Sequence, residues 1–171
     1  MTTYIIHQYT PKRLLGSASF DEQDISRKVL DFKDGRNHAK SWAAGEVAAR
    51  LIGSNVEGCL FVCIPAASDC ANRRRYARFS AEVSARCGLV DAFRHVSVVG
   101  KRTRCHVDRS QPMEENTVID GDFFRGREVV LFDDILTTGM TSTAFAQRLT
   151  QAGAKVKARV FLARTARRWC G

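Results

Sequence analysis

The sequence lacks any long apolar run, any internal repeat and any low-complexity tract. None of its apolar segments approaches the ~18–20 residues that a membrane-spanning helix needs. The first residues, Met1 to His7, have no basic head followed by an apolar stretch, so they do not resemble a secretory signal. These absences argue against a membrane protein, a fibrous protein and a disordered chain. They predict a single globular domain over residues 1–171 that resides in the cytoplasm.

Several familiar binding motifs are also missing. There is no Cys-x-x-Cys pair and no zinc-finger spacing, no Gly-x-Gly-x-x-Gly fingerprint, and no Gly-x-x-x-x-Gly-Lys-Ser/Thr loop. These absences argue against a zinc finger, a dinucleotide-binding domain and a P-loop nucleotidase. Because a cytoplasmic location is expected, the six cysteines are predicted to be reduced structural residues. A metal held by Cys59, Cys63 and Cys70 is the alternative.

Acidic residues are too few to balance the basic ones. The chain has 27 Lys and Arg against 18 Asp and Glu, a formal net charge of +9. Between Arg73 and Arg109 there are ten basic residues against three acidic ones. Such an excess indicates a polyanionic partner, which could be nucleic acid, an acidic membrane surface or a substrate rich in phosphates.

Apolar runs and amphipathic segments alternate along the chain. Residues 1–22 show no clear period, and a helical unit over 25–52 is interrupted by a turn at 33–36. Strands are predicted at 59–64, 96–99, 129–132 and 156–163, helices at 73–87 and 141–152, and a charged, ligand-closing loop at 101–118. This order predicts an α/β fold in which helices flank a mostly parallel sheet.

The segment from Val129 to Ser142 carries the most chemical information. Four apolar residues are followed by Asp133 and Asp134, and a Thr/Gly loop then leads into a helix. Ligands of parallel sheets bind where strands end, and a helix N-terminus offers free N–H groups to a phosphate. The two carboxylates are suited to sugar hydroxyls or to a nearby cation. A ribose 5-phosphate, which has a terminal phosphate and a vicinal diol, fits this arrangement.

This segment resembles the 5-phosphoribosyl-1-pyrophosphate (PRPP) signature of the type I phosphoribosyltransferases. The chain is most similar to the ComF-like, amidophosphoribosyltransferase-like branch, but it lacks that branch's N-terminal zinc module. Lys33 to Arg36 resembles the early lysine-glycine turn of the branch, and Ile64-Pro65 with Arg73 to Phe79 resembles its proline-ended strand and arginine-rich helix entry. The resemblance implies a small N-terminal hood over about residues 1–30 and a core over about 31–165.

The resemblance also implies a reaction and a set of residues. An enzyme of this family uses Mg-PRPP and displaces pyrophosphate with a nitrogen nucleophile, so Mg²⁺ is the implied cofactor. Asp133, Asp134 and Lys101 would be catalytic, and the two aspartates would meet the metal indirectly. The remaining residues implied are Thr137, Thr138, Gly139, Met140 and Thr141 for the 5-phosphate, and Ala66, Ala67, Ser68, Lys101 and Arg102 for pyrophosphate.

A second function stays open at this point. The same fold could sense PRPP or a nucleotide without catalysis, or bind nucleic acid through its basic surface. Arg164, Arg167, Arg168 and Trp169 form the segment most typical of a nucleic-acid contact. The resemblance implies a homodimer, and the acceptor substrate is not indicated by any motif.

Overall fold

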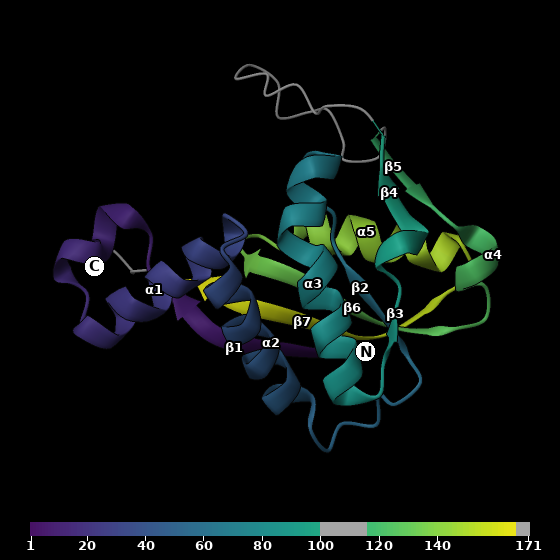
Figure 1. Ribbon diagram of the computed structural model, residues 1–171, viewed down its shortest axis with the longest axis horizontal. Helices are drawn as coiled ribbons and strands as arrows, with labels where there is room; N and C mark the ends of the chain where they lie inside the picture. Colours follow the sequence, from purple (N-terminus) through teal and green to yellow (C-terminus); the bar gives the residue numbers. More distant parts are fainter. Residues whose placement is uncertain (100–115, 167–171) are drawn as a thin grey trace.

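The computed structural model describes residues 1–99 and 116–166, which form a sheet with helices on both faces (Figure 1). The strands are β1 Thr2–Tyr9, β2 Leu60–Cys63, β3 Val90–Asp91, β4 Val96–Val98, β5 Thr117–Ile119, β6 Glu128–Leu136 and β7 Lys155–Thr165. The helices are η1 Lys12–Ser17, α1 Phe20–Lys33, α2 Asn37–Leu51, α3 Asp69–Cys87, η2 Phe93–His95, α4 Gly121–Phe124 and α5 Met140–Gln151.

Five strands form one parallel sheet in the order β1-β7-β6-β2-β3. Its central strand, β6, pairs with β7 on one side and with β2 on the other. Parallel strands end at the same edge of a sheet, so the carboxyl ends of β1, β7, β6 and β2 lie together. The predicted α/β fold, a mostly parallel sheet flanked by helices, is confirmed.

Buried apolar residues form two clusters, one on each face of the sheet. One cluster joins α1, α2 and α3 to the face that carries Phe61, Val130 and Phe132. The other joins α4 and α5 to the face that carries Val62 and Leu131. Neighbouring residues of β2 and β6 thus point into opposite cores, which is why these strands appear in the sequence as continuous apolar runs.

Aromatic side chains hold α1 and α3 against β2 and the middle of β6. Phe32, Phe61, Tyr76, Phe79 and Phe132 pack against one another, with 4.6 Å between the ring centroids of Phe79 and Phe132. All five rings are almost completely buried. Phe132 directly precedes the aspartate pair, so this packing also fixes the backbone from which the pair projects.

The first strand was not predicted, because residues 1–22 show no clear period. Thr2–Tyr9 pairs in parallel with β7 at the edge of the sheet, and four of its central side chains are half-buried. An edge strand buries too little of either face for a strong alternating pattern. The assignment of residues 1–30 to a hood stays a prediction.

The predicted strand at 96–99 exists, but it is not part of the main sheet. The short β3 lies beside β2, and the η2 turn then redirects the chain so that β4 pairs antiparallel with β5. Sequence reasoning recognised the apolar run but had no information about its partner. The predicted loop at 101–118 falls largely on residues 100–115, outside the described residues, and its last two residues begin β5.

Gly35 ends the turn between α1 and α2 in a conformation that favours glycine. Its φ is +75°, and a Cβ placed there would lie 2.8 Å from Cγ of Arg74. We expect Gly35→Ala to lower the free energy of unfolding by about 2–3 kcal/mol, because the alanine is both conformationally strained and too close to α3. Urea unfolding would measure this loss.

Gly53→Ala is the matched control for this prediction. Gly53 has a φ of +76°, but no atom lies within 4 Å of an added Cβ. The control should therefore lose only the conformational cost of about 1 kcal/mol. Equal losses in the two variants would show that the contact with Arg74 does not constrain the turn.

Candidate functional site

A cavity of about 500 Å³ opens at the carboxyl edge of the sheet. The residues that line it come from β1, α1, the β2–α3 loop, α3, β6, the β6–α5 loop, α5 and β7. They are Tyr9, Lys33, Ile64, Pro65, Ala66, Ala67, Arg75, Tyr76, Asp133, Asp134, Ile135, Thr137, Thr141 and Thr165. The cavity thus brings together both predicted aspartates, two of the predicted threonines and part of the predicted pyrophosphate loop.

Asp134 is held by an ion pair with Arg75. Nη1 of Arg75 donates to Oδ2 of Asp134 at 2.9 Å, and the two side chains are only 15% and 10% exposed. The backbone N–H of Ile135 donates to the other oxygen of Asp134 at 2.8 Å. Nε of Arg75 donates to the carbonyl of Lys33 at 2.8 Å, so the arginine also joins the end of α1 to the site.

Asp133 has a pKa well above the usual value for an aspartate. Its burial and the neighbouring carboxylate of Asp134 raise the pKa of Asp133 to about 7, although Arg75 partly opposes this effect. The backbone N–H of Asp134 donates to Oδ1 of Asp133 at 2.9 Å. A half-buried carboxylate with a raised pKa is well suited to accept hydrogen bonds from ligand hydroxyls or to face a cation.

The predicted phosphate loop is distributed over adjoining hollows. Gly139 lines a small hollow together with Asp133, Thr137 and Thr141, whereas Thr138 lines a neighbouring one beside Arg164 and Thr165. Met140 is exposed at the first position of α5. These residues follow β6 directly, so the aspartates and the loop are placed by one strand–turn–helix unit.

The N-terminus of α5 is open. Its N-cap, Gly139, has a φ of +81° and offers no side-chain cap, whereas α1 and α3 are capped by Ser19 and Ser68. Among the described residues, the N–H of Met140 donates to Oγ1 of Thr138 in a long hydrogen bond of 3.4 Å. N–H groups without strong partners at a helix start are the groups that bind a phosphate.

Part of the predicted pyrophosphate loop already makes hydrogen bonds within the protein. The N–H of Ala66 donates to Oδ1 of the buried Asn72 at 3.0 Å, and Oγ of Ser68 accepts from Ala71 as the cap of α3. Ala67 is exposed and lines the cavity. The other predicted pyrophosphate ligands, Lys101 and Arg102, lie outside the described residues.

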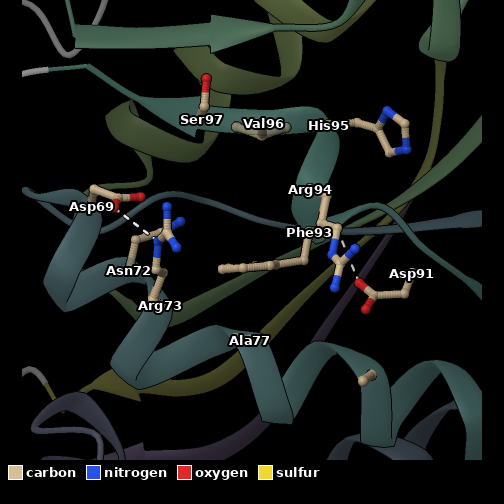
Figure 2. Close-up of a pocket in the computed structure, with 11 residues that line it drawn as sticks. Asp69, Asn72, Arg73, Ala77, Asp91, Phe93, Arg94, His95, Val96 and Ser97 are labelled. Carbon is tan, nitrogen blue, oxygen red and sulfur yellow. Dashed lines mark hydrogen bonds and ion pairs between the residues drawn. The ribbon is translucent and has the colours of Figure 1, made fainter.

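A second, larger hollow of about 780 Å³ lies on another side of α3 (Figure 2). Asp69 and Arg73 form an ion pair in its wall, and Phe93 and Arg94 come from the segment after β3. No predicted site residue among those that the structure describes lines this hollow. Asn72 lines this hollow and also holds the N–H of Ala66.

Sequence reasoning missed several residues of the cavity. Lys33 was noted only for its family resemblance, Arg75 was weighed but not assigned to the site, and Tyr9 and Thr165 were not considered. Oγ1 of Thr165 is buried without a hydrogen-bond partner among the described residues. No local pattern could have found these residues, because their partners are distant in the sequence; Arg75 and Asp134, for example, are 59 residues apart.

The donor set fits a metal held mainly by its ligand. Both oxygens of Asp134 already accept hydrogen bonds from the protein, which leaves Asp133 as the better placed carboxylate. Mg²⁺ commonly keeps several waters and substrate oxygens, so one indirect carboxylate is sufficient. Within residues 1–99 and 116–166, no group of three or more His, Cys, Asp or Glu could hold a metal alone, including the three cysteines considered above.

Comparison with known proteins finds likenesses among solved structures. No protein-family model matches the sequence, and no curated protein matches it. An adenine phosphoribosyltransferase from Thermoanaerobacter pseudethanolicus is 24% identical, with a TM-score of 0.49 over 81% of this chain and 74% of that chain. An allosteric regulatory enzyme of purine biosynthesis is 20% identical, with a TM-score of 0.46 over 71% of this chain and 25% of that one.

A hypoxanthine-guanine-xanthine phosphoribosyltransferase is 11% identical, with a TM-score of 0.37 over 74% of this chain and 73% of that chain. These likenesses, below 25% identity and a TM-score of 0.5, assign neither an activity nor a substrate to the chain. No helix in the described part of the chain is long and apolar enough to cross a membrane.

Proposed function

We propose that the protein is a phosphoribosyltransferase, a glycosyltransferase that uses Mg-PRPP and displaces pyrophosphate with a nitrogen nucleophile. One observation carries the proposal: the aspartate pair and the open N-terminus of α5 face adjoining hollows at the end of one strand. Such a site has places for both the hydroxyls and the phosphate of a ribose 5-phosphate. The acceptor, a base or an amine, remains open in this proposal.

Each part of the reaction has residues suited to it. Asp133 would accept hydrogen bonds from the ribose hydroxyls and stabilise the cationic sugar that forms as pyrophosphate leaves. The loop from Thr137 to Thr141 would hold the 5-phosphate and keep the sugar in place. Mg²⁺ would supply positive charge to the leaving pyrophosphate. In the described part of the chain, Lys33 is the exposed cation at the cavity, and it could add to this positive charge.

The direct test is pyrophosphate release. The protein would be incubated with Mg-PRPP and one acceptor at a time. The acceptors are ammonia, purine bases, pyrimidine bases and orotate. Acceptor-dependent release is expected with one class. Tight binding of PRPP with no release for any acceptor would favour the alternative, a non-catalytic sensor on the same fold. The nucleic-acid alternative stays a prediction, because Arg167, Arg168 and Trp169 lie outside the described residues.

Thr138→Val tests the phosphate loop separately from catalysis. Thr138 is exposed beside the start of α5, so the valine should not disturb packing. We expect calorimetry to show at least tenfold weaker binding of ribose 5-phosphate, about the 1.4 kcal/mol of one lost charge-assisted hydrogen bond. Thr3→Val, at an exposed position of β1, is the control and should bind normally. Unchanged affinity in Thr138→Val would show that the Thr138 hydroxyl does not bind the 5-phosphate.

A further inference from the structure

Three cations converge where α2 packs against α3. Lys40 lies on α2, and Arg74 and Arg78 lie one turn apart on α3, which runs beside α2 (Figure 1). Lys40 is only 7% exposed, and its Nζ donates to the carbonyl of Arg74 at 2.8 Å. Burial, followed by the charges of Arg78 and Arg74, lowers the pKa of the Lys40 ammonium. We call these three residues the cationic triad.

No acidic residue pairs with the triad in the described part of the chain. Several carboxylates on the surrounding elements already bind other groups. Asp31 pairs with Arg36 and His38 at 3.1 Å each, Asp69 with Arg73 at 2.8 Å, Glu82 with Arg86 at 2.6 Å and with Ser41 at 3.3 Å, and Asp134 with Arg75 at 2.9 Å. The triad is therefore a local excess of charge rather than part of an ion-pair network.

This arrangement of charges lowers the stability of the fold when no anion is bound. Like charges one helical turn apart repel, and the Lys40 ammonium has one hydrogen-bond acceptor among the described residues, so it has donors left for a ligand. Arg74 and Arg78 are exposed, so their side chains can reach a ligand above the buried lysine. A phosphoryl group, which has several oxygens and a high charge, suits two guanidinium groups and one ammonium.

We propose that Lys40, Arg74 and Arg78 form a binding site for a free phosphorylated anion, separate from the cavity that holds Asp133. A free anion is favoured over nucleic acid because the three cations meet at one place rather than along a stripe. The inference does not depend on the proposed function.

Calorimetric titration with inorganic pyrophosphate tests the site. Arg74→Gln/Arg78→Gln should bind pyrophosphate at this site at least tenfold more weakly than the unchanged protein. The matched control, Arg73→Gln/Arg86→Gln, removes two charges from the same helix at positions that are paired with Asp69 and Glu82. It should retain the binding event. Lys33→Gln, which removes the exposed cation of the cavity, should also retain it, so pyrophosphate bound in the cavity would be seen separately.

Stability supplies a second readout. Without an anion, Arg74→Gln/Arg78→Gln should be no less stable than the unchanged protein in urea, because repulsion is relieved. Pyrophosphate should raise the urea midpoint of the unchanged protein more than that of this variant. The proposal would be overturned by equal pyrophosphate affinity in both double variants. It would also be overturned if a single-stranded oligonucleotide, and not pyrophosphate, lost affinity in Arg74→Gln/Arg78→Gln.

Discussion

Asp133→Asn is expected to make the protein more stable at pH 8 and at the same time to weaken its binding of ribose 5-phosphate. Burial and the charge of Asp134 raise the pKa of Asp133 from 3.8 to about 7, so the folded state disfavours the carboxylate. Asparagine has no charge, and its amide oxygen can still accept the N–H of Asp134, which donates to Oδ1 at 2.9 Å. The substitution thus removes a destabilising charge and keeps the local geometry.

The sign of the pH dependence follows from proton binding. Between pH 3.8 and about 7 the unfolded chain has lost the Asp133 proton and the folded chain retains it, so stability falls as the pH rises through this window. A full shift of this size corresponds to about 4 kcal/mol, and partial solvent access reduces the expected gain in Asp133→Asn to roughly 2 kcal/mol at pH 8. At pH 4 the variant and the unchanged protein should be nearly equal.

Urea unfolding at pH 4, 6 and 8 measures the stability gain, and calorimetry measures the loss of affinity. Loss of a charged acceptor for the ribose hydroxyls should weaken ribose 5-phosphate binding at least tenfold. Asp122→Asn is the control, since that carboxylate is exposed and its ion pair with Arg125 is also exposed. If Asp133→Asn were less stable than the unchanged protein at pH 8, this result would show that the Asp133 carboxylate does not destabilise the fold.

Arg75→Met should cause the largest loss of stability among these variants. The change leaves Asp134 buried without its cationic partner and also frees the Lys33 carbonyl that Nε holds at 2.8 Å. Breaking a buried pair by removing one partner typically costs 3–5 kcal/mol. We expect a loss of about 3 kcal/mol in urea unfolding, because both side chains retain slight exposure. Ribose 5-phosphate binding should also weaken, since Asp134 and the end of α1 would be less well fixed.

A double-mutant cycle separates the ion pair from simple packing. Asp134→Asn combined with Arg75→Met removes both charges and keeps the oxygen that accepts the N–H of Ile135. The double variant should recover at least half of the lost stability. Arg73→Met is the exposed control on the same helix, where the pair with Asp69 is 72% and 49% exposed, and it should lose less than about 1 kcal/mol. Equal losses in Arg73→Met and Arg75→Met would contradict the assigned role.

Much of the fold and the centre of the site could be predicted because they are local in the sequence. The strand from Glu128, the aspartate pair, the Thr/Gly loop and the start of α5 are consecutive, so hydrophobic pattern and turn chemistry are enough to place them. The same holds for the turn between α1 and α2, where Gly35 meets a steric need. Continuous apolar runs also identified β2 and β6 as strands buried on both faces.

The tertiary structure alone decided which distant segments meet. It placed Thr2–Tyr9 at the edge of the main sheet and moved Val96–Val98 into a separate antiparallel pair. It also brought Arg75 to Asp134, Lys33 to the cavity and Lys40 to the carbonyl of Arg74. Strand partners and buried ion pairs depend on packing between elements many residues apart, whereas caps, turns and apolar periods act within a few residues. The sequence therefore determined the chemical groups of the site, and packing determined their charge partners and ionisation.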